Sequence, residues 1–160
     1  MRSRLLLILA AFVSIGLHAQ TIPDLKVEDP AGKAVSVKSL ADGKSPFVVT
    51  FWASWCKPCL RELAALEEVA PDWTGKYPLR IYAVSVDDSR SIAEAKALAA
   101  SSDWPATVLF DTKQALKQAL KVTSIPHVFV FDKNGKLVWN HMGYIPGSEE
   151  DLLQKVLETE

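Results

Sequence analysis

Two residues separate the two cysteines of the chain, Cys56 and Cys59. Thiols at this spacing can form a structural disulfide, supply half of a metal site, or exchange electrons with another thiol pair. A disulfide between them closes a loop of only four residues, and so short a loop removes little entropy from the unfolded chain. A stabilising crosslink is therefore the weakest of the three interpretations.

A metal site would need ligands beyond the two cysteines. His127 and His141 are too far apart in the sequence for the usual zinc-binding pattern, and no copper motif surrounds them or the neighbouring Met142. A haem attachment motif needs a histidine directly after the second cysteine, where this chain has Leu60. The sequence thus favours a reactive thiol pair that needs no metal and no cofactor, and it leaves copper binding open as an alternative.

The segment around the cysteines predicts a strand followed by a helix. Residues 45–53, "SPFVVTFWA", are apolar and β-prone, as in a strand that is buried on both faces. Residues 59–70 repeat apolar side chains at helical spacing, and "APDW" at 70–73 is expected to end that helix. Cys56 is therefore expected at the start of a helix, where unpaired N–H groups and a partial positive charge stabilise a thiolate.

The two thiols are expected to have different tasks. The pKa of a CxxC thiol at a helix start falls to roughly 3.5–7.5, against about 8.5 for a free cysteine. Lys57 adds a positive charge that favours the thiolate, and Pro58 suits the first helical turn because its fixed φ is compatible there. We expect Cys56 to be the exposed nucleophile and Cys59, one turn inside the helix, to be the more buried resolving thiol.

The rest of the chain alternates predicted strands and helices, which indicates an α/β fold with a mixed, mainly parallel sheet and helices on both faces. In such folds the active site lies beyond the carboxyl ends of the strands, which is where Cys56 falls. Ser91 with Glu94 forms a capping-box pattern, and Ser148 with Asp151 is expected to cap the last helix. The expected elements are a hairpin at 25–37, strands at 79–87 and 106–111, helices at 91–101, 112–121 and 148–158, and a hairpin at 127–140 around Asn134-Gly135.

The bulk properties indicate one exported globular domain. The chain has 160 residues, of which 49% are hydrophobic and 23% are charged, and a net charge of −1 gives no basic field for nucleic acid.

Residues 1–19 combine two arginines, an uncharged apolar run at 5–17 and a small residue, Ala19, as in a secretory signal peptide. The apolar run is short for a bilayer, which takes about 20 residues, so an uncleaved membrane anchor is the less favoured alternative. We expect a domain at 20–160 in the periplasm or another exported compartment, where disulfides persist.

Two segments resemble a known family. "FWASWCKPC" resembles the active-site strand and turn of thioredoxin-fold proteins, and "SIPHVFVFDKNGKLV" resembles their second signature, an X-Pro bond followed by a hairpin. The N-terminal hairpin and the extra strand and helix material at 91–121 are similar to the exported TlpA/ResA-like thiol–disulfide oxidoreductases. From residue 22 onward, the resemblance implies a thioredoxin-like fold: a central mixed β-sheet flanked by helices, with an N-terminal β-hairpin and an inserted strand-helix element.

The resemblance assigns tasks to residues around the cysteines. Pro126 matches the cis-proline that packs beside the cysteines, and the backbone of Ile125 would bind a substrate strand. An X-Pro bond is also the only common route to a cis peptide. Trp55 matches the tryptophan that flanks the nucleophile, and with Lys57 and Pro58 these residues would shape the substrate site.

Proton transfer is expected to involve Glu62. It lies three residues after Cys59 and so shares a helix face with it, and TlpA/ResA-like proteins often have a glutamate there. Many thioredoxins have a buried aspartate where this chain has Thr50, which cannot act as a base. We therefore expect a half-buried Glu62 to exchange a proton with Cys59. His127 is expected either to lie near the site or to be a partly exposed strand histidine without a catalytic task.

The resemblance implies an enzyme that reduces disulfides of exported proteins, apocytochromes among them, and so contributes to redox homeostasis and cytochrome c maturation. A membrane thiol donor would recharge it, and we expect a monomer that binds no nucleic acid. The alternatives are an oxidase or isomerase of the same fold and a copper- or peptide-binding module without turnover. The N-terminal hairpin is also similar to peroxiredoxins, but a CxxC pair differs from their isolated peroxidatic cysteine.

Overall fold

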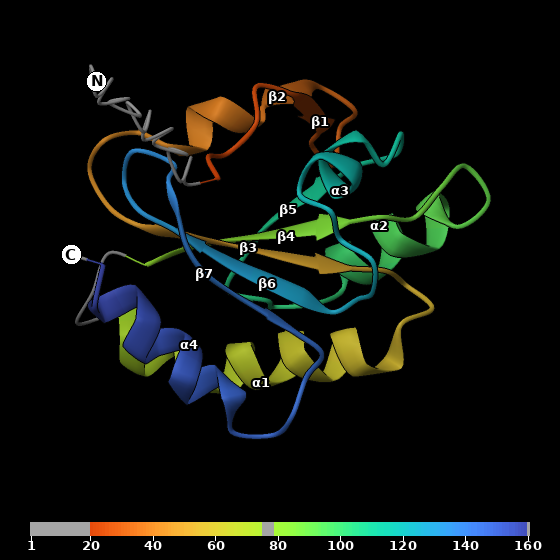
Figure 1. The fold of residues 1–160 in the computed structure, drawn as a ribbon. Coiled ribbons are helices and arrows are strands. Elements are labelled where there is room, and N and C mark those ends of the chain that lie inside the picture. The colour runs from red at the N-terminus through yellow and green to blue at the C-terminus, as the bar shows by residue number, and fades with distance from the viewer. Residues whose placement is uncertain (1–19, 75–78, 160) are drawn as a thin grey trace, which may run out of the picture.

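A single mixed sheet forms the centre of the protein in a computed structural model that describes residues 20–74 and 79–159 (Figure 1). Within these residues the sheet has seven strands in the order β2-β1-β5-β4-β3-β6-β7. The elements are β1 Lys26–Glu28, β2 Ala34–Ser36, the 3-10 helix η1 Val37–Leu40, β3 Phe47–Trp52, α1 Lys57–Thr74, β4 Arg80–Ser85, α2 Ile92–Ala100, β5 Thr107–Phe110, α3 Ala115–Ala119, β6 His127–Phe131, β7 Leu137–Met142 and α4 Ser148–Leu157. The expected thioredoxin-like α/β fold with its N-terminal hairpin is confirmed.

The closing hairpin, β6 and β7, is antiparallel, and the direction of β6 decides where the site forms. Strands β3, β4 and β5 are parallel, but β6 runs antiparallel to β3, and the hairpins at both edges are antiparallel as well. The sheet is therefore mixed but not mainly parallel. Because β6 runs against β3, its first residue, His127, lies opposite Phe51 near the end of β3. The segment before β6 is thus brought beside the segment that follows β3.

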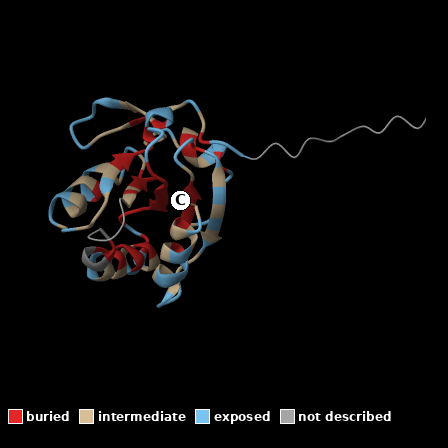
Figure 2. Cartoon of the chain, turned by 90° about the vertical axis from the view of Figure 1, so that its left-hand side faces the viewer, coloured by how far each residue is buried: buried red, intermediate tan, exposed pale blue. Residues whose placement is uncertain are grey.

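Two apolar layers hold the helices on the sheet. Helices α1 and α4 lie together on one side of the sheet, and α3 lies on the other side with the N-terminal hairpin (Figure 1). Val48 of β3, Leu66 of α1 and Leu152 of α4 belong to one buried cluster, while Phe51 and Leu116 of α3 belong to the other. Buried residues are concentrated in the central strands and on the helix faces that cover them (Figure 2). The central strands are thus a rigid base for the loops at their ends.

Helix α1 is longer than expected. The pattern at 70–73 predicted an end there, but the helix continues through Pro71 to Thr74. Proline lacks an N–H and costs about 3 kcal/mol within a helix. Trp73 offsets this cost because it is buried in the cluster with Val48 and Leu66. Tertiary packing therefore decides where this helix ends.

The two expected side-chain caps are wrong. Ser91 makes no capping bond because it is already in a helical conformation, with φ −117° and ψ −7°. Asp88 takes that place: its backbone carbonyl accepts N–H bonds from Ser91 and Ile92, and its carboxylate accepts the N–H of Arg90. At α4 the cap is Gly147, whose φ of +97° suits glycine, so Ser148 already lies inside the helix.

The expected signal peptide, residues 1–19, lies outside the described part of the chain. Among the helices that the structure describes, none is long and apolar enough to cross a membrane.

Candidate active site

Cys56 and Cys59 form a disulfide at the start of α1. After β3 the chain makes a turn in which the N–H of Cys56 donates to the carbonyl of Ala53 at 3.0 Å. The helix begins at Lys57, so Pro58 lies in its first turn, as expected. The buried strand therefore delivers Cys56 to the amino end of the longest described helix.

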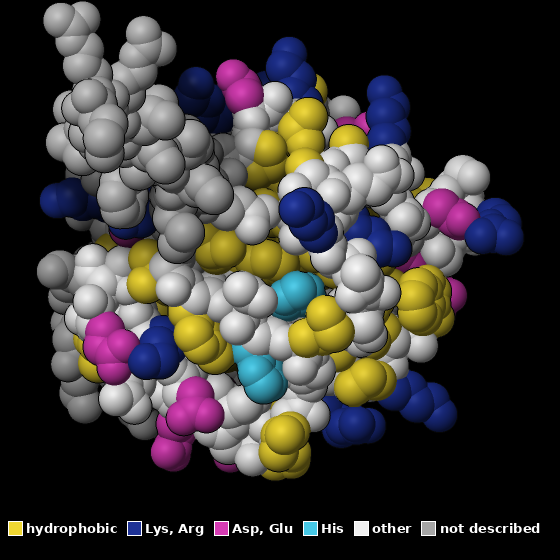
Figure 3. Space-filling model, in the orientation of Figure 1, with side chains coloured by type: hydrophobic (Ala, Val, Ile, Leu, Met, Phe, Trp, Pro, Cys, Tyr) yellow, Lys and Arg dark blue, Asp and Glu magenta, His cyan; other side chains and the backbone are white. Residues whose placement is uncertain are grey.

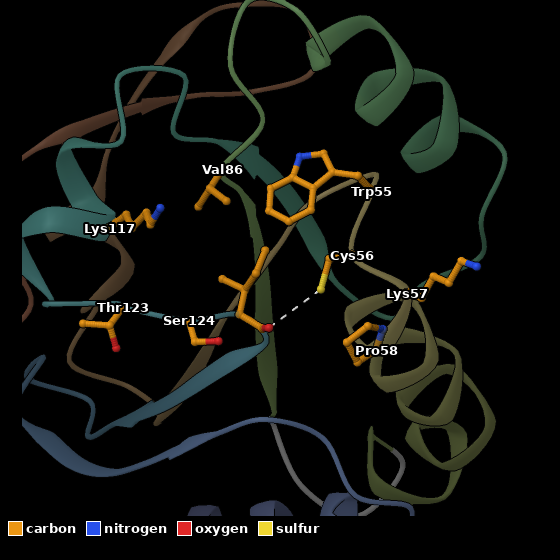
Figure 4. A pocket seen from close by; sticks show the side chains of 9 residues that line it. Trp55, Cys56, Lys57, Pro58, Val86, Lys117, Thr123 and Ser124 are labelled. Carbon is orange, nitrogen blue, oxygen red and sulfur yellow. Dashed lines mark hydrogen bonds between the residues drawn. The ribbon is translucent and has the colours of Figure 1, made fainter.

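The two sulfur-bearing residues differ in exposure, but less than expected. Cys59 is fully buried, which agrees with the prediction, whereas Cys56 is only 5% exposed and is not an open surface thiol. Trp55, which is 65% exposed, projects beside Cys56, and the Ile125 carbonyl lies on its other side (Figure 4). The small accessible part of Cys56 opens into a groove between these residues.

Backbone groups converge on the sulfur of Cys56. The N–H of Cys59 donates to Cys56 Sγ at 3.3 Å, and the carbonyl oxygen of Ile125 lies 3.8 Å from the same atom. A disulfide sulfur carries no hydrogen, so the second contact becomes a hydrogen bond only when Cys56 is a thiol. The N–H bond and the helix start stabilise a thiolate at Cys56. Lys57 is exposed, and its amine points away from the sulfur of Cys56 (Figure 4).

The peptide bond between Ile125 and Pro126 is cis, as the resemblance implied. The carbonyl of Pro126 accepts the N–H of Gly143 at 2.8 Å. The carbonyl of Ile125 faces Cys56 instead, and the Ile125 N–H has no backbone partner among the described residues. This is the arrangement expected if Ile125 offers its backbone to a bound peptide strand.

A groove of about 510 Å³ runs from Cys56 along the end of the sheet (Figure 4). Its volume is in the range of binding sites for small molecules and short peptide segments. Trp55 and Val86 give it an apolar wall, and the hydroxyl side chains of Thr123 and Ser124 lie opposite Cys56. The residues around it are Trp55, Cys56, Lys57, Pro58, Val86, Lys117, Thr123, Ser124 and Ile125.

Glu62 is buried more deeply than expected, with 6% exposure, and is bonded to Thr50. The hydroxyl of Thr50 donates to Glu62 Oε2 at 2.6 Å. Burial raises the pKa of Glu62 to about 7, the Thr50 bond partly opposes this, and the nearby charge of Glu149 adds to it. Cys59 and Glu62 both face β3, since Cys59 Sγ lies 4.0 Å from the carbonyl of Phe51, the residue after Thr50. Glu62 thus has a pKa suited to proton exchange near neutral pH.

A small cavity lies between Glu62 and the start of α4. It has a volume of about 10 Å³ and is lined in part by Tyr144, Ser148 and Glu149, which is about the space that one water occupies. Burial raises the pKa of Tyr144, and the charges of Glu149 and Glu62 add to this effect. Glu62 thus has, beside its bond to Thr50, a small, partly polar-lined space.

His127 is neither partly exposed nor a cation beside the thiols. It is 6% exposed, its ring lies 4.2 Å from that of Phe129, and its Nε2 pairs with Asn140 Oδ1 at 3.1 Å. Burial lowers its pKa, the Asn140 bond opposes this, and the charge of His141 adds to the lowering. The ring is therefore neutral at pH 7 and serves as a packed strand residue.

The geometry also argues against a metal site at the histidines. His141 lies opposite Val128 in the ladder between β6 and β7. Neighbouring residues of a strand point to opposite faces, so His127 and His141 face different sides of the sheet. Among the residues described, no group of three or more His, Cys, Asp or Glu side chains is arranged to hold a metal ion.

The sequence reasoning missed a buried carboxylate, Asp87, which anchors the loop before Cys56. Asp87 is 1% exposed and follows β4. Its oxygens accept bonds from the N–H and the hydroxyl of Ser54, at 2.9 and 2.7 Å, and from the hydroxyl of Ser85 at 2.8 Å. The rule that sites lie at the carboxyl ends of neighbouring strands could have indicated it. These bonds fix the turn that carries Trp55 and Cys56.

Replacing Asp87 by asparagine should therefore destabilise the protein. The amide presents one acceptor where the carboxylate has two, so at least one buried hydroxyl or N–H loses its partner. We expect the free energy of unfolding to fall by about 1–3 kcal/mol, measured by urea denaturation of the oxidised protein. Asp103→Asn, the same change at an exposed position, should stay within about 0.5 kcal/mol. Equal stabilities of the two variants would mean that the Asp87 bonds contribute nothing net.

Several known proteins resemble the chain over most of its length. The model of the AhpC/TSA family matches residues 18–140. The thiol-disulfide oxidoreductase ResA of Geobacillus thermodenitrificans is 30% identical over 149 residues, which cover 86% of this chain and 83% of that protein. The solution structure of a thioredoxin-like protein from Porphyromonas gingivalis is 40% identical, with a TM-score of 0.75 and coverage of 86% and 90%. The pneumococcal exposed lipoprotein thioredoxin of Streptococcus pneumoniae is 28% identical, with a TM-score of 0.68 and coverage of 85% and 99%.

Proposed function

The chain belongs to the AhpC/TSA family, among its ResA-like thiol–disulfide oxidoreductases, and from this premise we propose that it reduces disulfides of exported proteins. The observation that best supports the proposal is that the two cysteines of the disulfide differ in their access to the groove. Cys56 opens into the groove beside the Ile125 carbonyl, while Cys59 is fully buried behind it. Only Cys56 can therefore meet a client directly.

The reaction proceeds in two exchanges. The Cys56 thiolate attacks one sulfur of the client disulfide; the Cys56–client bond forms, and the other client sulfur leaves and takes up a proton. Cys59 then loses its proton and attacks Cys56 Sγ, which forms the Cys56–Cys59 disulfide and releases the second client thiol. Two electrons pass from the protein to the client. In this scheme Glu62 accepts the proton of Cys59.

The reductase direction is proposed from the ResA-like relatives, and the site adds only limited stabilisation to the Cys56 thiolate beyond the helix start. A strong oxidant of this chemistry owes its potential to a stabilised reduced form. Here the N–H of Cys59 is the bonded donor at Cys56 Sγ, Lys57 points away, and burial keeps His127 neutral. The residue before the second cysteine is Pro58, where strong oxidants of this fold often have histidine. These features favour a reductase over an oxidase or isomerase.

The setting of the reaction is proposed from the N-terminus and the relatives. Residues 1–19 have the pattern of a signal peptide, and the pneumococcal relative is described as an exposed lipoprotein. We place the protein outside the cytosol, as a monomer without cofactor, recharged by a dithiol donor in the membrane. Its clients would be exported proteins with accessible disulfides, apocytochromes among them.

A redox titration tests the direction. We expect a reduction potential for Cys56–Cys59 between roughly −270 and −200 mV, the range of thioredoxin and glutaredoxins. The measurement equilibrates the protein in thiol–disulfide buffers, alkylates free thiols and determines the reduced fraction by mass spectrometry. A potential near about −120 mV, the value of a strong oxidant, would replace the reductase proposal by the oxidase alternative.

A further inference from the structure

The groove beside Cys56 has an uneven charge. Its lining contains two cations, Lys57 and Lys117, and no carboxylate. The amine of Lys57 points away from the groove, whereas the side chain of Lys117 extends from α3 toward Val86 and the groove (Figure 4). On the face of the molecule shown in Figure 3, acidic and basic side chains are interspersed, and the net charge of the chain is −1. The protein as a whole therefore has no positive surface potential that would attract an anion. The positive charge at the groove is local.

Lys117 is held at the groove wall by a chain of hydrogen bonds. Its amine donates to Gln114 Oε1 at 3.1 Å, and the amide of Gln114 donates to the carbonyl of Val86 at 3.0 Å. The backbone N–H of Lys117 donates to the buried carboxylate of Asp111 at 2.8 Å. Gln114 has a φ of +53°, which residues other than glycine rarely adopt. The local backbone and side chains thus fix the amine beside the groove.

The amine of Lys117 still has capacity to bind. An ammonium group has three donors, and the bond to Gln114 uses one of them. Lys117 takes part in none of the four ion pairs found in the described part of the chain. A half-buried cation at a groove wall without a carboxylate partner is complementary to an anion brought by a ligand.

We propose that Lys117 selects clients with an acidic side chain two residues from the cysteine that Cys56 attacks. This inference rests on the proposed disulfide exchange at Cys56. A client segment that lies in extended form along Ile125 alternates its side chains between two sides. If its cysteine points at Cys56, the residues two positions before and after it point into the same groove. The carboxylate of such a residue pairs with the Lys117 amine, while Trp55 and Val86 cover its apolar part.

The test uses reduced wild-type protein and short peptides with one cysteine activated as a 2-thiopyridyl disulfide. The Cys56 thiolate attacks the peptide sulfur and expels 2-thiopyridone, which is followed by absorbance. Cys59 then releases the peptide thiol, which is followed by chromatography. The peptides carry aspartate, asparagine or lysine two residues before or after the cysteine. Reaction of each peptide with 2-mercaptoethanol corrects for its intrinsic reactivity.

We expect the aspartate peptide to react about two- to fivefold faster than the asparagine peptide at low salt, the size of a partly exposed ion pair. The preference should shrink as salt is added. It should fall to about one in Lys117→Gln, persist in Lys117→Arg, and turn toward the lysine peptide in Lys117→Glu. Lys113→Gln removes the same charge at an exposed residue that does not line this groove, and it should keep the preference.

Three other results would overturn the inference, in two different ways. Equal rates for the aspartate and asparagine peptides, or a preference that survives in Lys117→Gln, would remove Lys117 as the selecting residue while disulfide exchange stands. Release of thiopyridone without release of any peptide thiol would contradict the proposed two-step exchange, and the inference would fall with it.

Discussion

Replacing Cys56 by serine should abolish disulfide reduction, with a loss of at least about 10³-fold, the scale on which enzymes lose turnover when a nucleophile is removed. Cys56 reaches the groove and receives the N–H of Cys59, while Cys59 is fully buried. The remaining thiol therefore cannot replace the missing one. Insulin reduction with dithiothreitol as the electron source measures the effect.

The complementary variant, Cys59→Ala, should stop the reaction half way. Cys56 can still attack a client, but no second thiol resolves the product, so Cys56–client disulfides accumulate. These adducts are visible as bands on non-reducing gels of the exported fraction, and they disappear when dithiothreitol is added. Mass spectrometry of the adducts identifies the clients, which neither the fold nor the groove specifies.

The double variant Cys56→Ser, Cys59→Ala serves as the control and should form no adducts. The assignment of roles would be wrong if Cys56→Ser trapped clients as efficiently as Cys59→Ala.

A metal-binding module predicts a different result, in which a chelator changes the activity of the wild-type protein. The described residues offer no cluster that could hold such a metal, so we expect chelation to change nothing.

The sequence predicted the centre of the site because its signals there are local. The buried strand at 47–52, the CxxC spacing and the X-Pro bond each act within a few residues, and all three are found where expected. The ends of helices were less predictable. Pro71 and the serines at 91 and 148 are strong local signals, but Trp73 packing, the Asp88 turn and the conformation of Gly147 outweigh them.

The place of the Ile125–Pro126 bond beside Cys56 was implied by the resemblance, but other contacts between distant segments carried no signal in the sequence. Nothing in the residues around Thr50 indicates that its hydroxyl bonds to Glu62, since this depends on how α1 lies against β3. The same holds for the bond between Asp87 and Ser54, and for Lys117 of α3, which lines the groove beside Cys56. A residue was thus found when its sequence neighbours or the family resemblance carried a signal, and missed when its environment came from the tertiary fold alone.

Replacing Glu62 by glutamine should slow turnover by about a hundredfold, the lower part of the range for general acid–base catalysis. Cys59 must lose its proton before it can attack the mixed disulfide, and it lies in a fully buried position. Glu62 shares its helix face and, with a pKa of about 7, is ready to accept that proton. Mixed disulfides should accumulate during turnover of Glu62→Gln, and the part of the pH dependence of the resolving step that is centred near pH 7 should disappear. An unchanged pH dependence of Cys59 reactivity would show that Glu62 has no part in proton transfer.

The same carboxyl predicts how stability depends on pH. Burial raises the pKa of Glu62 from its ordinary value of 4.5 to about 7, so between these values the folded protein holds a proton that the unfolded chain has released. The contribution of Glu62 to the stability of the folded state is fully present below about pH 4.5 and is lost as pH rises through about 7. The free energy of unfolding of the oxidised protein should therefore fall by roughly 3 kcal/mol over this range through Glu62 alone. Glu62→Gln should lack this fall and be the more stable protein at pH 8.

Two further variants separate this effect from a general change of charge. The bond from Thr50 lowers the pKa of Glu62, so Thr50→Val should raise that pKa and move the end of the fall in stability to higher pH. Glu67→Gln removes a carboxylate from an exposed position of the same helix and should keep the wild-type profile. Urea denaturation of the oxidised proteins between pH 4 and pH 9 measures all three. A profile of Glu62→Gln that runs parallel to the wild type would mean that Glu62 ionises as freely in the folded protein as in the unfolded chain. Glu62 would then have no burial-raised pKa to supply a base for Cys59 at neutral pH.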